Sequence, residues 1–140
     1  MPPYGLNVAL IDPFGIRGLK FETIRKLAAF SHMDLIIKFP VQDIRRNHQH
    51  QTDAITAAVG TDRWVGKVRL PEEAPRLMEF LREELSPFQY VDTFAKNALV
   101  TQSTNVPLYY LMYFTKHEKG VAIWNSIMQI DAKGQRRLDF

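Results

Sequence analysis

Cysteine is absent from this chain of 140 residues, and long hydrophobic runs are absent as well. Without cysteine the chain can form neither disulfides nor thiolate metal sites of its own, which is typical of proteins from a reducing compartment. Each apolar run is about ten residues or shorter, which is too short to span a bilayer. The N-terminus also lacks the basic segment and apolar core of a secretory signal. The sequence therefore predicts a soluble, cytoplasmic protein with no membrane partner.

A strong excess of charge of either sign is also missing. The 18 basic residues exceed the 15 acidic ones by three, giving a net charge of +3. This balance permits an anionic partner without requiring one. The length and the 46% share of hydrophobic residues suit one globular domain, residues 1–140, with a core of its own.

The order of predicted elements in the first part of the chain favours an α/β fold. Residues 8–11 form a short apolar run between turn residues, a pattern typical of a strand buried on both faces. Residues 21–31 have helical spacing, and residues 33–39 form a second apolar run that ends at Pro40. A strand, a helix and a strand of these lengths predict a right-handed parallel crossover, so we expect the two strands to be neighbours.

Helices are predicted in the middle of the chain. Residues 52–59 predict a short helix that Thr52 or Asp53 caps and that Gly60 ends in a left-handed conformation. We expect Trp64 to anchor the following loop by packing.

The last part of the chain predicts a helix, a hairpin and another helix. Residues 72–85 have the spacing of a helix that the Ser-Pro pair at 86–87 stops. Residues 90–101 and 106–115 are rich in Tyr, Val, Phe and Thr and predict an antiparallel hairpin. Apolar residues between 118 and 130 mark a final helix. Lys116 and His117, at the end of the hairpin, are expected to be solvated.

Asp12, Pro13, Phe14 and Gly15 follow the first predicted strand. A parallel strand that places a carboxylate, a proline, an aromatic ring and a glycine at its C-terminal end has the layout of an α/β active site. Gly15 and Gly18 either let the backbone approach a ligand or form a turn that requires positive φ.

The polar, basic residues 41–51 (VQDIRRNHQHQ) leave the second strand at the same rim as Asp12, and we interpret them as a substrate-facing loop. The candidate substrate-binding residues there are Arg45, Arg46, Asn47 and His48, which would contact phosphates of a nucleic acid. The alternative to phosphate binding is that these residues form a basic surface that contacts only solvent. Two histidines at i and i+2 without a nearby carboxylate make a poor metal site, so no metal is predicted.

Four blocks of sequence carry a resemblance to a known family. They are LIDPFGIRGLKFETIRKLA at residues 10–28, MDLIIKFPVQDIRRN at 33–47, VGTDRW at 59–64 and PLYYLMYFTKHEKG at 107–120. In this order the blocks resemble the three-Cys-motif partner protein family (TcmP) over nearly the whole chain. The element order is also similar to the second half of a class I S-adenosylmethionine-dependent methyltransferase, whose sheet ends in an antiparallel hairpin.

The resemblance implies a partial class I methyltransferase sheet, Rossmann-like, with helices on both faces. It also implies S-adenosylmethionine as the cofactor of the full-length family member and a three-cysteine-motif protein as a partner. Members are longer at the N-terminus, so we expect residues 1–140 to be the C-terminal part of a longer protein, a fragment without the first strands and the glycine-rich cofactor loop. The alternative is that the missing half is a separate polypeptide. In both cases residues 7–12 would have a bare edge that pairs with the missing part or with another chain.

Amino-methyltransferases place a polar residue, a proline and an aromatic ring at this rim. By position, Asp12 and Pro13 match and would orient a target amine, while Phe14 would line its pocket and Gly15 would lie at the cofactor. Phe14 and Gly15 depart from the usual Asp-Pro-Pro-Tyr pattern. The resemblance thus implies a methyltransferase-like domain for an amino group of nucleic acid, inactive alone. The alternative function is a non-catalytic module that docks the three-cysteine-motif protein.

Overall fold

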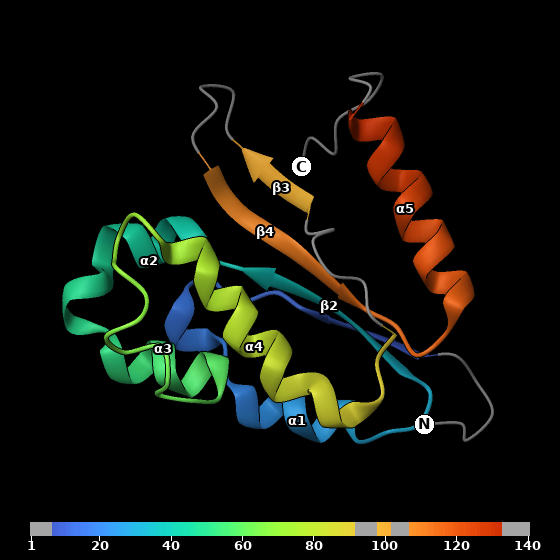
Figure 1. The fold of residues 1–140 in the computed structure, drawn as a ribbon, viewed down its shortest axis with the longest axis horizontal. Helices are drawn as coiled ribbons and strands as arrows, with labels where there is room; N and C mark the ends of the chain where they lie inside the picture. The colour runs from blue at the N-terminus through green and yellow to red at the C-terminus, as the bar shows by residue number, and fades with distance from the viewer. Residues whose placement is uncertain (1–6, 92–97, 102–106, 133–140) are drawn as a thin grey trace.

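The computed structural model describes residues 7–91, 98–101 and 107–132. Its sheet has four strands in the order β1-β2-β4-β3, as Figure 1 shows. They are β1 (Asn7–Ile11), β2 (Met33–Phe39), β4 (Pro107–Phe114) and β3 (Ala98–Thr101). β1 and β2 are parallel, and β4 is antiparallel to both β2 and β3. The predicted α/β class, parallel pair and antiparallel pair are confirmed, and the connection at 102–106 lies outside the described residues.

The parallel crossover runs through helix α1 (Phe21–Ala28), as predicted. β1 and β2 are paired directly, with Asn7 opposite Met33 and Ile11 opposite Ile37. Their carboxyl ends therefore lie at the same rim, which brings the loop after β1 next to the segment after β2.

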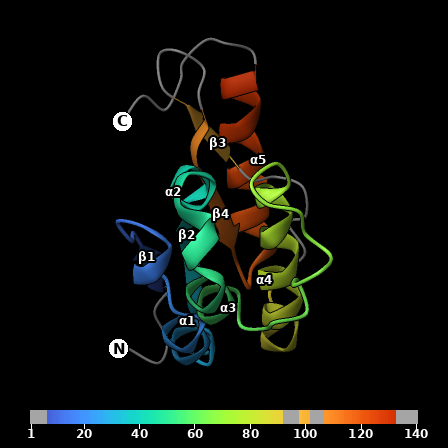
Figure 2. The same cartoon turned by 90° about the vertical axis from the view of Figure 1, so that its left-hand side faces the viewer.

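The hydrophobic core lies on one face of this sheet. On β2, Met33, Leu35, Ile37 and Phe39 alternate toward that face and are each at most 3% exposed. The same face is covered by helices α1, α2 (Val41–Asn47), α3 (Thr52–Val59) and α4 (Leu77–Leu85), as can be followed in Figures 1 and 2. Their buried apolar side chains join those of β2 in one cluster.

The second face of the sheet is covered only in part among the described residues. Helix α5 (Glu118–Ala132) begins where predicted and packs the buried Trp124 against Tyr113 of β4, with 5.1 Å between ring centroids. On β1, in contrast, the side chains of Val8 and Leu10 are 58% and 66% exposed. The prediction that β1 is buried on both faces is therefore wrong for the described chain, because no described helix covers these two side chains.

The predicted ends of α3 and α4 are confirmed, but α1 is shorter than predicted, and the cap of α3 and the start of α4 differ from the prediction. α3 ends at Gly60, whose φ of 87° is left-handed as predicted. The cap prediction is wrong, because Gln51 holds the N-cap position and neither Thr52 nor Asp53 forms a capping side-chain bond there. α4 ends at Leu85 ahead of the Ser-Pro pair, as predicted, but the segment before it is a 3-10 turn, η3 (Ala74–Arg76).

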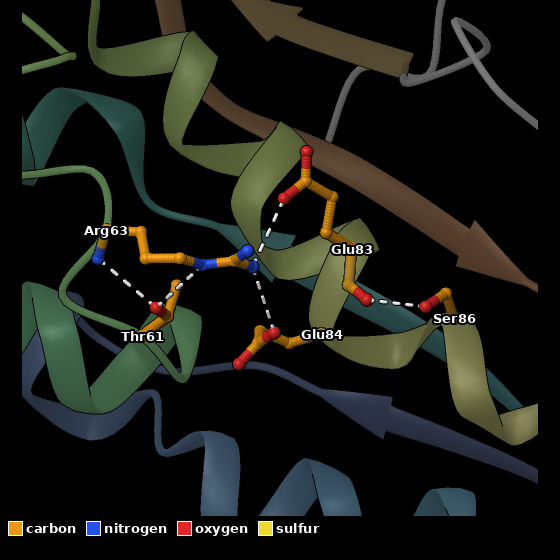
Figure 3. Close-up of polar contacts among 5 residues, drawn as sticks. All are labelled: Thr61, Arg63, Glu83, Glu84 and Ser86. Atoms are coloured by element: carbon orange, nitrogen blue, oxygen red, sulfur yellow. Dashed lines mark hydrogen bonds and ion pairs between the residues drawn. The ribbon is translucent and has the colours of Figure 1, made fainter.

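The loop between α3 and α4 is held by one buried ring and a set of surface ion pairs. Trp64 is buried, and its indole N–H donates to Thr56 Oγ1 at 3.0 Å, which confirms its predicted anchoring role. Figure 3 shows the guanidinium of Arg63 between Glu83 and Glu84 of α4, each 3.2 Å away. These exposed pairs orient the loop but contribute little to stability.

Candidate functional site

The candidate site is built on the β1–α1 loop (residues 12–20), which begins at the carboxyl end of β1. Three buried residues hold this loop against the protein: Pro13, and the fully buried Ile16 and Leu19. Between Pro13 and Ile16, Phe14 is fully exposed, and the Asp12 side chain before them is 60% exposed. The loop therefore presents a carboxylate and an aromatic ring to solvent, on a backbone that is fixed on both sides.

Asp12 forms an ion pair across the two parallel strands. Lys38 Nζ of β2 lies 3.2 Å from Asp12 Oδ1, and the same ammonium lies 4.6 Å from the ring centroid of Tyr109 on β4. A carboxylate and an aromatic face are the two groups that bind a cation or an N–H donor. The structure therefore shows Asp12 in an ion pair with a cation, here from within the chain.

The segment after β2 is a helix and not the predicted loop. Val41–Asn47 form α2, and His48–His50 form the 3-10 turn η2. The prediction failed because the two buried side chains of α2, Val41 and Ile44, are isolated among polar residues, although their spacing of three is helical. Their burial against the sheet fixes the helix.

Asp43 of α2 binds the β1–α1 loop directly. Its Oδ2 accepts the Ile16 backbone N–H at 2.8 Å, and its Oδ1 accepts the Asn47 side-chain amide at 3.0 Å. A Cβ on Gly15 would lie 2.8 Å from Asp43 Oδ2, so only glycine allows this approach. Asp43 was missed from the sequence because no local pattern marks a residue that binds a backbone group 27 positions away.

The positive-φ interpretation of the two loop glycines is wrong. Gly15 has a φ of −155°, and among the described glycines only Gly60 and Gly66 have positive φ. The close approach at Gly15 is made to Asp43, a residue of this chain.

The predicted substrate-binding residues lie at the same rim as Asp12. Arg46 and Asn47 are exposed, whereas Arg45 and His48 are half-buried. Arg17 joins the two segments, because its guanidinium donates to the backbone oxygen of His50 at 3.2 Å. Within the described ranges, no hydrogen bond or ion pair connects Arg45, Arg46 or His48 to Asp12. The part of the chain that the structure describes also contains no group of three His, Asp or Glu side chains suited to a metal ion.

A second polar cluster lies at the opposite end of β2. The buried Asp34 accepts hydrogen bonds from Thr115 Oγ1 at 2.8 Å, Tyr113 OH at 3.1 Å and the Lys116 backbone N–H at 3.1 Å. We call these four residues the Asp34 cluster. Burial raises the pKa of the Tyr113 hydroxyl. Burial also lowers the pKa of the Lys116 amine, and the negative charge of Asp34 acts against this second shift.

Lys116 is not simply solvated, as its position had suggested. Its ammonium donates to the backbone oxygens of Ala28 at 2.7 Å and Phe30 at 2.8 Å, at the end of α1. The bond to Ala28 satisfies a carbonyl group that a helix leaves unpaired at its C-terminus, whereas the Phe30 oxygen also accepts the Met33 backbone N–H at 3.3 Å. Through these contacts the Asp34 cluster joins β2, β4 and α1, which is a structural role.

No family model, curated protein or solved structure matches this chain. The likeness to the three-Cys-motif partner family accordingly rests on the four sequence blocks. No helix in the described ranges has both the length and the apolar character needed to cross a membrane.

Replacing Asp43 by alanine is expected to release the β1–α1 loop while the core stays folded. The Ile16 N–H would lose its acceptor, so its amide exchange with solvent should accelerate by about tenfold, the factor that corresponds to about 1.4 kcal/mol. Hydrogen exchange followed by NMR measures this rate. As a control, Asp53→Ala removes an exposed carboxylate from α3 and should leave the Ile16 rate unchanged.

Proposed function

We propose that this chain is the acceptor-binding half of a methyltransferase-like protein of the three-Cys-motif partner family, acting on an amino group of nucleic acid. The observation that carries the proposal is the meeting of two segments at one rim. The carboxyl ends of the parallel strands β1 and β2 bring Asp12 and Phe14 beside the basic helix α2. Ligands of open α/β sheets bind at this rim.

The sheet supports the proposed relation to class I methyltransferases. Two parallel strands are followed by an antiparallel pair at the other end of the sheet, as the resemblance implies. β1 is the last strand at its end of the described sheet, where further parallel strands of a longer sheet would add.

The chemistry of the rim supports an amine as the acceptor. Asp12 already holds the ammonium of Lys38, so it can accept an N–H from a target amino group in the same way. The exposed Phe14 ring offers a face on which a base can stack, and Arg46 and Lys38 can neutralise phosphates. In this proposal Asp12 has a positioning role. Holding the amine in the right orientation lowers the barrier to methyl transfer, and the protein does not have to transfer a proton.

The Asp43 carboxylate lies beside Gly15, the residue that the resemblance places at the cofactor. The space that a ligand would need beside this glycine is bordered by the Asp43 carboxylate, an anion that would repel a phosphate or carboxylate group. Binding of S-adenosylmethionine is thus proposed only for a protein that adds the first strands and the glycine-rich loop of the fold.

The test is titration calorimetry with S-adenosylmethionine on the 140-residue chain and on a version extended at its N-terminus by the upstream reading frame. We expect heat of binding from the extended protein alone. If that protein binds, Asp12→Ala should abolish methyl transfer to DNA or RNA and leave cofactor affinity unchanged. An extended protein that ignores the cofactor contradicts the enzyme proposal.

A non-catalytic docking module is the second candidate function. It is favoured by the exposed apolar side chains of Val8 and Leu10 at the end of the described sheet. Co-expression with a three-cysteine-motif protein encoded beside this chain tests it. A stable complex that Leu10→Lys disrupts supports docking, and separate elution of the two proteins contradicts it.

A further inference from the structure

We propose that the outer edge of β1 pairs with the same edge of a second copy of this chain. The two strands would be antiparallel, and the two-fold axis of the dimer would pass between the two Ala9 residues. This inference goes beyond the proposed function and concerns the 140-residue chain by itself, because the strands of a longer sheet would occupy the same edge. Figure 2 shows β1 at the outer side of the sheet, and no strand lies beyond it in the described part of the chain.

The backbone of β1 presents hydrogen-bonding groups at this edge. The Asn7 N–H donates to the His32 carbonyl oxygen at 3.0 Å, so Asn7 faces the β2 side of the parallel ladder. Successive residues of a strand direct their amide and carbonyl groups to opposite sides, so the odd-numbered residues of β1 face β2. The groups of Val8 and Leu10 therefore point to the outer edge.

This pattern is self-complementary. A two-fold axis at Ala9 places Val8 of one copy opposite Leu10 of the other, and Leu10 opposite Val8. Because both residues direct their amide and carbonyl groups outward, each pair can form the double hydrogen bond of an antiparallel ladder. Ala9 meets its own copy at the axis in a non-hydrogen-bonded pair, where side chains are closest and a small residue fits. A symmetric interface requires such a match of one surface with itself.

The side chains of the edge also favour a second copy. Val8 and Leu10, 58% and 66% exposed, project from the face of the sheet opposite the core. In the dimer they would lie beside the same two side chains of the partner and form one apolar patch across the axis. β1 (NVALI) contains neither a charged residue nor a proline, the usual devices that stop edge strands from pairing.

The expected dimer is weak, because one short strand per subunit makes a small interface. We expect a dissociation constant of the order of 10 µM, as for the smallest class of interfaces. Sedimentation equilibrium between about 1 and 200 µM of the 140-residue chain should therefore show a monomer–dimer equilibrium.

A pair of matched variants locates the interface. Leu10→Lys adds a charge to the edge and should raise the dissociation constant at least tenfold, since two ammonium groups would meet the apolar patch. Ile123→Lys is the control, because Ile123 of α5 is 63% exposed, close to the value for Leu10, but lies outside β1. It should leave the dissociation constant unchanged. Circular dichroism checks that both variants are folded.

A single cysteine tests the axis itself. The chain has no cysteine of its own, so Ala9→Cys creates a unique thiol where the two strands would be closest. Mild oxidation should convert this variant to a covalent dimer, whereas Ala57→Cys, at an exposed position of α3, should remain mostly monomeric. A chain that is monomeric at all concentrations, a dimer that only Ile123→Lys weakens, or cross-linking no greater for Ala9→Cys than for Ala57→Cys would overturn the proposal.

Discussion

Replacing Gly60 by alanine is expected to lower the free energy of unfolding by about 3 kcal/mol, from two additive causes. Gly60 has a φ of 87°, which an alanine adopts only at a cost of about 1–2 kcal/mol. Its new Cβ would also lie 2.6 Å from Cγ of Phe21, so the whole ring of Phe21 would have to move. Urea unfolding, with an unchanged m-value, measures the loss.

Gly66→Ala separates the two causes. Gly66 has a similar φ of 81°, but nothing lies within 4 Å of the place where its Cβ would be. This variant should lose about 1 kcal/mol, the backbone cost alone. If Gly60→Ala and Gly66→Ala lose the same free energy of unfolding, the contact of Phe21 in α1 with the end of α3 contributes nothing to stability.

Replacing Asp34 by alanine is also expected to cost about 3 kcal/mol of unfolding free energy, because three hydrogen bonds to its carboxylate are lost at once. The hydroxyls of Thr115 and Tyr113 and the N–H of Lys116 would lose the carboxylate in a buried place. Thermal unfolding followed by circular dichroism measures the loss as a lowered Tm.

Asp34→Asn is the matched control for this cluster. The amide keeps one oxygen acceptor and nearly the same shape, so the loss should be less than half that of the alanine variant. A Tm for Asp34→Ala within one degree or so of the wild-type value would contradict a structural role for the cluster, since about 1 kcal/mol moves the Tm of a domain this size by several degrees.

Much of the fold could be predicted because its signals are local. The strand at Met33–Phe39 is a run of apolar residues that Pro40 ends, and its bounds are those predicted. Gly60 ends α3, and the Ser-Pro pair follows the end of α4. In each case the residue that sets the boundary is adjacent to it, so the short-range pattern is sufficient.

The candidate site could be predicted only in its location. Asp12 and the segment after Pro40 meet at one rim, because parallel strands end at the same side of a sheet. The contacts within the rim could not be predicted. Lys38 pairs with Asp12 because the register of β1 and β2 places them beside each other, and Asp43 reaches the Ile16 N–H because the core buries Ile44.

The sequence by itself determined the α/β class, the parallel crossover and the position of Asp12, Pro13 and Phe14 after the first strand, since each follows from hydrophobic period and adjacent turn residues. The tertiary structure alone decided that residues 41–47 are a helix, that Gly15 adjoins Asp43, and that Val8 and Leu10 are exposed. The physical reason is that burial and pairing depend on what covers a residue from elsewhere in the chain. An apolar run such as β1 has the same pattern whether its second face is covered or bare.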